Sequence, residues 1–450
     1  MKSIHKNKIV LSLLAVSALS ISLQAADWLS IAGTEPSFIK KDGKKVENHN
    51  NKPHIWGFLQ AGYQKNEGDV FIPAAGPKAG LNLTPFSMLT PNLNSQSGFE
   101  INRARLAARG MIDKENTLNY FFMTEFGEDG ITKPAGHDSN NYLTDASITY
   151  RGIPYFNVRM GQFKYPGSEE GLRAVFTSTY RNFSTAGNQL LLERFLPNNA
   201  KEVKVGSGTF QAAPEQSVGA FRDRGVELFH TAKVADKTTL TWAGMVGSGT
   251  GMSSSNASGE PTYYGYLAAE HLFGKGKGYY TQSLKGFAWY QNGKRELNNE
   301  EYTRERYGLG MNYFHDGLRV GAEYIKAKGM IYNGAKDVDA DPFGADWQYQ
   351  IAADKRNEAD GGYVNLQYFF VPKKWEAMVR YDYLNRLTNS TADERKFKTT
   401  TLGLSYHFKG PTRIDVNYAL RDADAPNNAK AQKVLDNTGN LLSVQATLKF

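Results

Sequence analysis

The chain has 450 residues, a formal net charge of +8 and no cysteine, so it cannot form disulfides or thiolate metal sites. Beyond its N-terminal segment, no apolar run approaches the length of about 18 residues that indicates a membrane-spanning helix. The 44 glycines, 25 tyrosines and 25 phenylalanines, together with a low mean hydropathy, are typical of many β-strands with one apolar and one polar face.

The N-terminal segment has the pattern of an export signal. Met1–Lys8 carries three lysines, Ile9–Leu23 is apolar, and small residues follow at Ala25 and Ala26. This pattern predicts a secretory signal peptide at residues 1–25. The alternative is a membrane anchor, but the apolar run is short for a helix that must span a bilayer with about 20 residues. Residues 26–53 are polar without periodicity, and we expect a short exposed arm.

From His54 onward, runs of residues rich in Tyr, Phe, Val and Gly follow a period of two. In the run 98–111, for example, Arg103, Arg105 and Arg109 share one parity, and Leu106 lies on the other. Such alternation places the two sets on opposite faces of a sheet. We predict sixteen strands, at 54–64, 98–111, 117–127, 140–151, 155–163, 217–233, 238–246, 262–273, 282–291, 302–314, 318–327, 360–371, 374–384, 397–408, 411–421 and 441–450.

The connections between these strands alternate between long and short. A soluble β-sandwich also alternates apolar and polar residues, but it has no reason to separate its loops in this way. Long loops at one end and tight turns at the other, around an even number of antiparallel strands, are typical of an outer-membrane barrel. We therefore predict an all-β fold, a transmembrane antiparallel barrel at residues 54–450.

The connection 164–216 is too long to be an ordinary loop. It mixes aromatic residues with basic ones, among them Lys164, Arg173, Arg181 and Arg194. Its length and charge predict that it folds into the barrel as a constriction loop and sets the size and charge of a pore.

Three motifs carry a resemblance to a known family. They are Arg159-Met-Gly-Gln-Phe-Lys164, Glu193-Arg-Phe-Leu-Pro197 and Arg222-Asp-Arg-Gly-Val226. In these motifs the chain resembles the phosphate-selective porins of the O and P type. The resemblance implies a homotrimer of sixteen-stranded barrels with pores narrowed by inward loops. The terminal Phe450 resembles the C-terminal aromatic signal that the outer-membrane assembly machinery reads.

The predicted inner face is rich in arginine, which stays charged and matches phosphate or carboxylate oxygens with a planar fork. Rings of Arg or Lys select anions, so we expect an outer-membrane porin for small hydrophilic solutes, with a preference for phosphate or similar anions. Acidic residues on the same face leave a general, weakly selective porin as the alternative. The predicted pore-lining residues are Arg103, Arg105, Arg109, Arg159, Lys164, Arg173, Arg181, Arg194, Arg304 and Arg306.

Other functions have weaker signals. The chain has neither an H-E-x-x-H nor a G-x-S-x-G motif, so a barrel enzyme is not indicated, and an adhesin with a plugged lumen is a further alternative. Asp337-Val-Asp-Ala-Asp341 has a calcium-like spacing, but Pro342 replaces the required glycine. We expect no cofactor and no nucleic-acid partner, and contact with outer-membrane lipid and lipopolysaccharide.

Overall fold

The computed structural model describes most of the chain. The described residues are 53–69, 97–113, 117–127, 142–192, 219–252, 260–276, 280–297, 300–332 and 351–450, the backbone of 201–205 and 208–212, and Leu29, Ile72 and Gly80. The predicted signal peptide, Arg194 and the possible calcium loop at 337–341 lie outside them.

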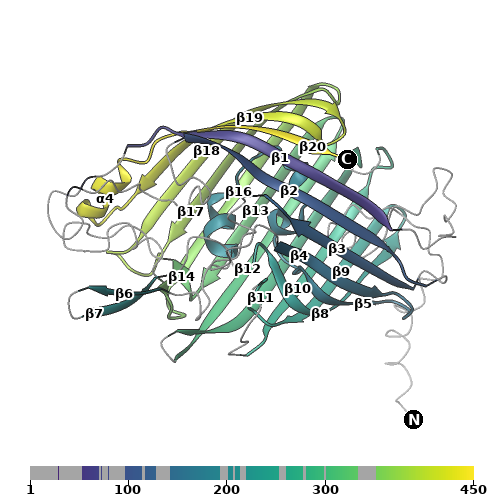
Figure 1. Cartoon of the computed structure of the whole chain (residues 1–450), viewed down its shortest axis with the longest axis horizontal. Coiled ribbons are helices and arrows are strands. Elements are labelled where there is room, and N and C mark those ends of the chain that lie inside the picture. The colour runs from purple at the N-terminus through teal and green to yellow at the C-terminus, as the bar shows by residue number, and fades with distance from the viewer. Residues whose placement is uncertain are drawn as a thin grey trace, which may run out of the picture.

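Sixteen antiparallel strands form a closed barrel, which confirms the predicted fold class (Figure 1). The barrel strands are β1 (His54–Asn66), β2 (Ser97–Met111), β3 (Leu118–Glu125), β4 (Tyr142–Tyr150), β5 (Asn157–Lys164), β8 (Arg222–Ala235), β9 (Thr238–Gly247), β10 (Thr262–Leu272), β11 (Ser283–Leu297), β12 (Glu300–His315), β13 (Leu318–Lys328), β16 (Glu358–Val371), β17 (Trp375–Arg386), β18 (Arg395–Lys409), β19 (Thr412–Asp424) and β20 (Leu441–Lys449). Each corresponds to one predicted strand, with ends that differ by a few residues.

The barrel closes where the first strand meets the last. In the register between β1 and β20, Phe58 lies opposite Lys449. Beyond that pair, Gly57 and Phe450 exchange two backbone hydrogen bonds of 3.0 and 3.1 Å. Closure removes the free edges that an open sheet would expose.

Tight turns and long loops lie at opposite ends. Asp316 and Gly317 connect β12 to β13 with positive φ angles of 44° and 90°, a conformation typical of a two-residue hairpin turn. The C-terminus lies at this turn end, whereas helix α4 (Ala429–Leu435) and the hairpin of β6 (Lys201–Val205) and β7 (Gly208–Ala212) lie at the loop end (Figure 1).

The period of two is visible in the exposure of the side chains. Leu106, Met160, Leu309 and Leu402 are among the apolar residues exposed on the outside. Polar residues of the opposite parity, such as Arg159, are buried inside. None of the helices in the described ranges has the length and apolar character that crossing a membrane requires.

The long connection after β5 has more regular structure than a turn-rich loop. It contains the helix α3 (Glu169–Leu172), the 3₁₀ turn η3 (Val175–Thr177), the π-helical turn η4 (Gly187–Leu191) and the β6–β7 hairpin. A second small hairpin pairs β14 (Ile331–Tyr332) with β15 (Ile351–Ala352). The sequence did not indicate these short elements, since none has a long periodic pattern.

Candidate functional site

Residues 165–192, here called the inward loop, lie across the interior of the barrel. Their side chains and backbone bond to inward-facing groups on strands all around the wall. Glu169 contacts β11, Ser168 contacts β13, and Thr179 contacts β16. Arg181 forms an ion pair with Glu100 of β2 and reaches Gln445 of β20. A segment with partners on so many strands can only be inside the barrel.

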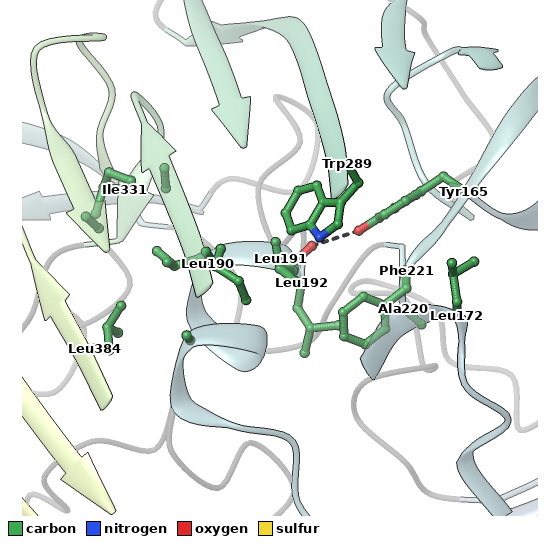
Figure 2. Close-up of a cluster of buried hydrophobic side chains, with 14 of the residues drawn as sticks. Tyr165, Leu172, Leu190, Leu191, Leu192, Ala220, Phe221, Trp289, Ile331 and Leu384 are labelled. Carbon is green, nitrogen blue, oxygen red and sulfur yellow. Dashed lines mark hydrogen bonds between the residues drawn. The ribbon is translucent and has the colours of Figure 1, made fainter. Parts of the chain in front are cut away.

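An apolar cluster holds the end of the inward loop against the wall. Leu190, Leu191 and Leu192 are almost fully buried, and Figure 2 shows them between Trp289 of β11 on one side and Leu384 of β17 on the other. The Tyr165 hydroxyl donates a 3.1 Å hydrogen bond to the Leu191 carbonyl (Figure 2). Burial of a leucine side chain contributes about 1.5–3 kcal/mol, so this cluster fixes the loop strongly.

Two arginines of β12 bind the same loop end through its backbone. Arg306 donates to the Leu190 carbonyl from Nε at 2.8 Å and to the Met330 carbonyl from Nη2 at 2.8 Å. Arg304 donates to the Leu190 carbonyl at 3.2 Å. These guanidinium groups therefore position the loop.

A cavity of about 700 Å³ lies between the inward loop and the turn end of the barrel. Nine basic and three acidic residues are among those that line it. The basic residues are Arg105, Arg109, Arg159, Lys164, Arg173, Arg222, Lys285, Arg319 and Lys449. The acidic residues are Asp145, Glu169 and Glu270.

Several of these cations are neutralised by carboxylates. Arg105 Nε lies 2.6 Å from Glu125 Oε2. Arg222 forms a two-pronged pair with Asp145 at 3.0 and 2.9 Å. Arg159 pairs with Glu227, with Nε at 2.7 Å from Oε2, and stacks on the ring of Phe163 at 4.4 Å. Lys285 Nζ lies 2.6 Å from Glu169.

Three other cations of the cavity have no ion pair with a carboxylate in the part of the chain that the structure describes. Lys164 Nζ donates to the Arg173 carbonyl at 2.8 Å. The Arg173 guanidinium donates to the Thr177 carbonyl at 2.8 Å and hydroxyl at 3.1 Å. Lys449 lies over the rings of Phe176 and Trp56. These three side chains contact backbone carbonyls, a hydroxyl group or aromatic rings instead.

Glu170, in helix α3 of the inward loop, is surrounded by polar groups. It accepts hydrogen bonds from Ser184 N at 2.9 Å and Ser184 Oγ at 2.5 Å, and lies 3.6 Å from Arg380 Nη1. Burial raises the pKa of the Glu170 carboxyl above its ordinary value, against the opposing effects of Arg380 and Ser184.

The family described as phosphate-selective porin O and P matches residues 88–188 and 349–450. The chain therefore resembles this family in both its N-terminal and its C-terminal part, and it is an outer-membrane porin of a Gram-negative bacterium. No curated protein matches the chain.

Solved structures show the same fold. A Salmonella typhi OmpF in complex with daunomycin is 13% identical, with a TM-score of 0.54, and the match covers 89% of this chain and 98% of that one. An anion-selective porin from Comamonas acidovorans is 13% identical, with a TM-score of 0.51, and the match covers 89% and 99%. The family and the fold are those of a channel rather than an enzyme.

The structure brings only part of the predicted set together in this porin. Arg105, Arg109, Arg159, Lys164 and Arg173 line the cavity. Arg103 donates to Gln60 at 2.9 Å and is not part of this lining. Arg181 lines a separate small hollow of about 30 Å³, and Arg304 and Arg306 bind carbonyls of the loop.

Some cations of the porin cavity were missing from the predicted set. Arg222 and Lys285 lie on strands whose facing was ambiguous in the sequence, because apolar or aromatic residues occur on both faces. On β11, Phe287 and Trp289 share the buried parity of Lys285, whereas Tyr290 is exposed outside. Lys449 could have been found, since it alternates with the outward Leu448.

Proposed function

We propose that this porin prefers anions and that the inward loop forms its constriction. The observation that carries the proposal is the excess of positive charge around the cavity. Among the described residues that line the cavity, nine are basic and three are acidic. Glu125, Glu227 and Glu376 lie behind the lining, beside Arg105, Arg159 and Arg319. With these three included, the described residues supply nine cations and six carboxylates.

The physical reason is the field inside a concave wall of low dielectric. Such a wall concentrates ions of the opposite sign, and dissolved salt weakens the effect. Lys164 and Arg173 lie on or beside the inward loop, at its junction with β5. Lys164 and Arg173, which have no ion pair with a carboxylate among the described residues, therefore lie where the proposed constriction meets the cavity.

A planar-bilayer recording of the purified porin in a KCl gradient tests this proposal. We expect a reversal potential with the sign of anion preference, smaller at high salt. The charge reversal Arg173→Glu should lower the anion-to-cation permeability ratio at least ~2-fold, because it changes the local charge by two units. Arg356→Glu, on an exposed loop where Arg356 pairs with Asp354, is the matched control.

Cation preference of the unaltered porin would contradict the proposal. A reversal potential near zero would instead support the second candidate, a general and weakly selective porin, which the many internal ion pairs favour.

We further propose a homotrimer, with small anionic solutes as the ligands and lipid and lipopolysaccharide around the barrel. Phe450 is proposed as the signal for the outer-membrane assembly machinery.

A further inference from the structure

The cavity has an aromatic wall where the first strand meets the inward loop. Trp56 and Phe58 of β1 share the inward parity, and Phe176 of the loop packs on both of them. Its ring centroid lies 5.7 Å from that of Trp56 and 5.2 Å from that of Phe58. All three rings line the cavity; Phe58 is buried, whereas Trp56 and Phe176 are partly exposed.

Cations lie beside these rings. Lys449 Nζ is 5.0 Å from the Phe176 centroid and 5.6 Å from that of Trp56. Arg109 Cζ is 5.9 Å from the Trp56 centroid and 5.2 Å from that of Phe121 on β3. The wall therefore offers aromatic surface with positive charge between 5.0 and 5.9 Å from the ring centroids.

Phe176 is held in place from two sides. Arg413 of β19 donates from Nη1 to the Phe176 carbonyl at 2.7 Å and from Nη2 to the Ser178 carbonyl. On the other side, the hydrogen bonds from Arg173 to Thr177 fix the turn that carries the ring. A ring that is already ordered loses little entropy when a solute packs on it.

The same lining is poorly arranged for a small inorganic anion. Phosphate is best bound by several guanidinium groups whose N–H donors converge on one point. The guanidinium groups of Arg105, Arg159 and Arg222 each donate instead to a carboxylate of the barrel wall. An anion with an apolar body can instead use the aromatic wall and the nearby charge together.

We propose that this cavity favours organic anions that carry an aromatic ring, with the ring against Trp56 and Phe176 and the carboxylate toward Lys449 and Arg173. The inference rests on the proposed anion preference and specifies its solute class. A cavity of about 700 Å³ lies in the range that accepts organic molecules of this size.

The test is the block of chloride current through the purified full-length porin by three added anions: benzoate, cyclohexanecarboxylate and phosphate. Benzoate should half-block the current at a concentration about 5- to 10-fold lower than cyclohexanecarboxylate or phosphate, because aromatic pairs contribute beyond the area that they bury. This comparison uses the unaltered protein, so it decides the matter even if a variant does not assemble.

The variant Phe176→Leu should remove most of the benzoate advantage. Phe183→Leu is the matched control, because it removes a ring from the same loop where Phe183 packs on Phe221, away from the cavity. Equal block by the three anions in a porin that prefers chloride over potassium would overturn the aromatic-anion inference alone. Cation preference in the KCl gradient would overturn the proposed function and this inference with it.

Discussion

At the scale of single residues, the interior arginines differ mainly in how their charge is compensated. Arg380 of β17 is compensated by two acids, with Nε 3.1 Å from Asp382 and Nη1 3.6 Å from Glu170. Arg386, at the end of the same strand, is fully buried and donates from Nη1 to Gln189 at 3.0 Å. Its Nε and Nη2 have no hydrogen-bond partner among the described residues, and it lies opposite Arg395 in the register.

This difference predicts opposite results for two similar substitutions. Arg386→Met should leave the stability of the barrel unchanged or raise it, because it removes a buried charge with unsatisfied donors and keeps most of the volume. Arg380→Met should cost about 3 kcal/mol, since it leaves Asp382 and Glu170 without their cation. Denaturant unfolding of the two variants in detergent measures both effects. A loss of stability for Arg386→Met as large as that for Arg380→Met would show that the charge of Arg386 is compensated as well as that of Arg380.

At the scale of elements, the inward loop carries ionisable groups that respond to pH. Since the pKa of Glu170 is raised, its carboxyl takes up a proton at a higher pH than an ordinary glutamate does. Protonation removes a negative charge from the interior and leaves Arg380 less compensated. Acidification therefore makes the interior more positive.

We expect the anion preference of the porin to rise as the pH falls, beginning at a pH above the range near 4 in which ordinary carboxyls protonate. Glu170→Gln should show the higher preference already at pH 7 and a flatter dependence on pH. Reversal potentials in a KCl gradient, recorded as the pH is lowered, measure the effect. An identical pH dependence in the variant and the unaltered porin would assign the titration to other groups.

The sequence was informative about elements and much less about their pairings. Alternation located the strands because each of them has one face toward lipid and one toward the interior. Ion pairs depend instead on the register between strands, which alternation leaves open. Arg105 meets Glu125 on the next strand, but Arg159 meets Glu227 from across the whole long connection. For the same reason, Arg304 and Arg306 had the right facing, but their contacts with the loop backbone could not be predicted.

At the scale of the whole molecule, the barrel depends on the seam between β1 and β20. This seam pairs two segments that lie almost 400 residues apart in the sequence. The Phe450 ring packs against Gly57 so closely that an added Cβ on Gly57 would lie 2.7 Å from Phe450 Cζ and 2.6 Å from the Arg105 carbonyl oxygen. The glycine therefore leaves the space that the terminal phenylalanine fills.

Gly57→Ala should therefore weaken closure, whereas Gly244→Ala should not. Gly244 also lies in a barrel strand, but an added Cβ there would have no atom of the described residues within 4 Å. The two substitutions have the same intrinsic effect on a strand, so the difference between them reports the contact at the seam. We expect Gly57→Ala to lose about 1–3 kcal/mol of stability from overpacking and to lower the temperature at which the folded barrel converts to the unfolded band in gel electrophoresis. If the two variants convert at the same temperature, the seam accommodates the methyl group, and the packing of the Phe450 ring does not require a glycine at position 57.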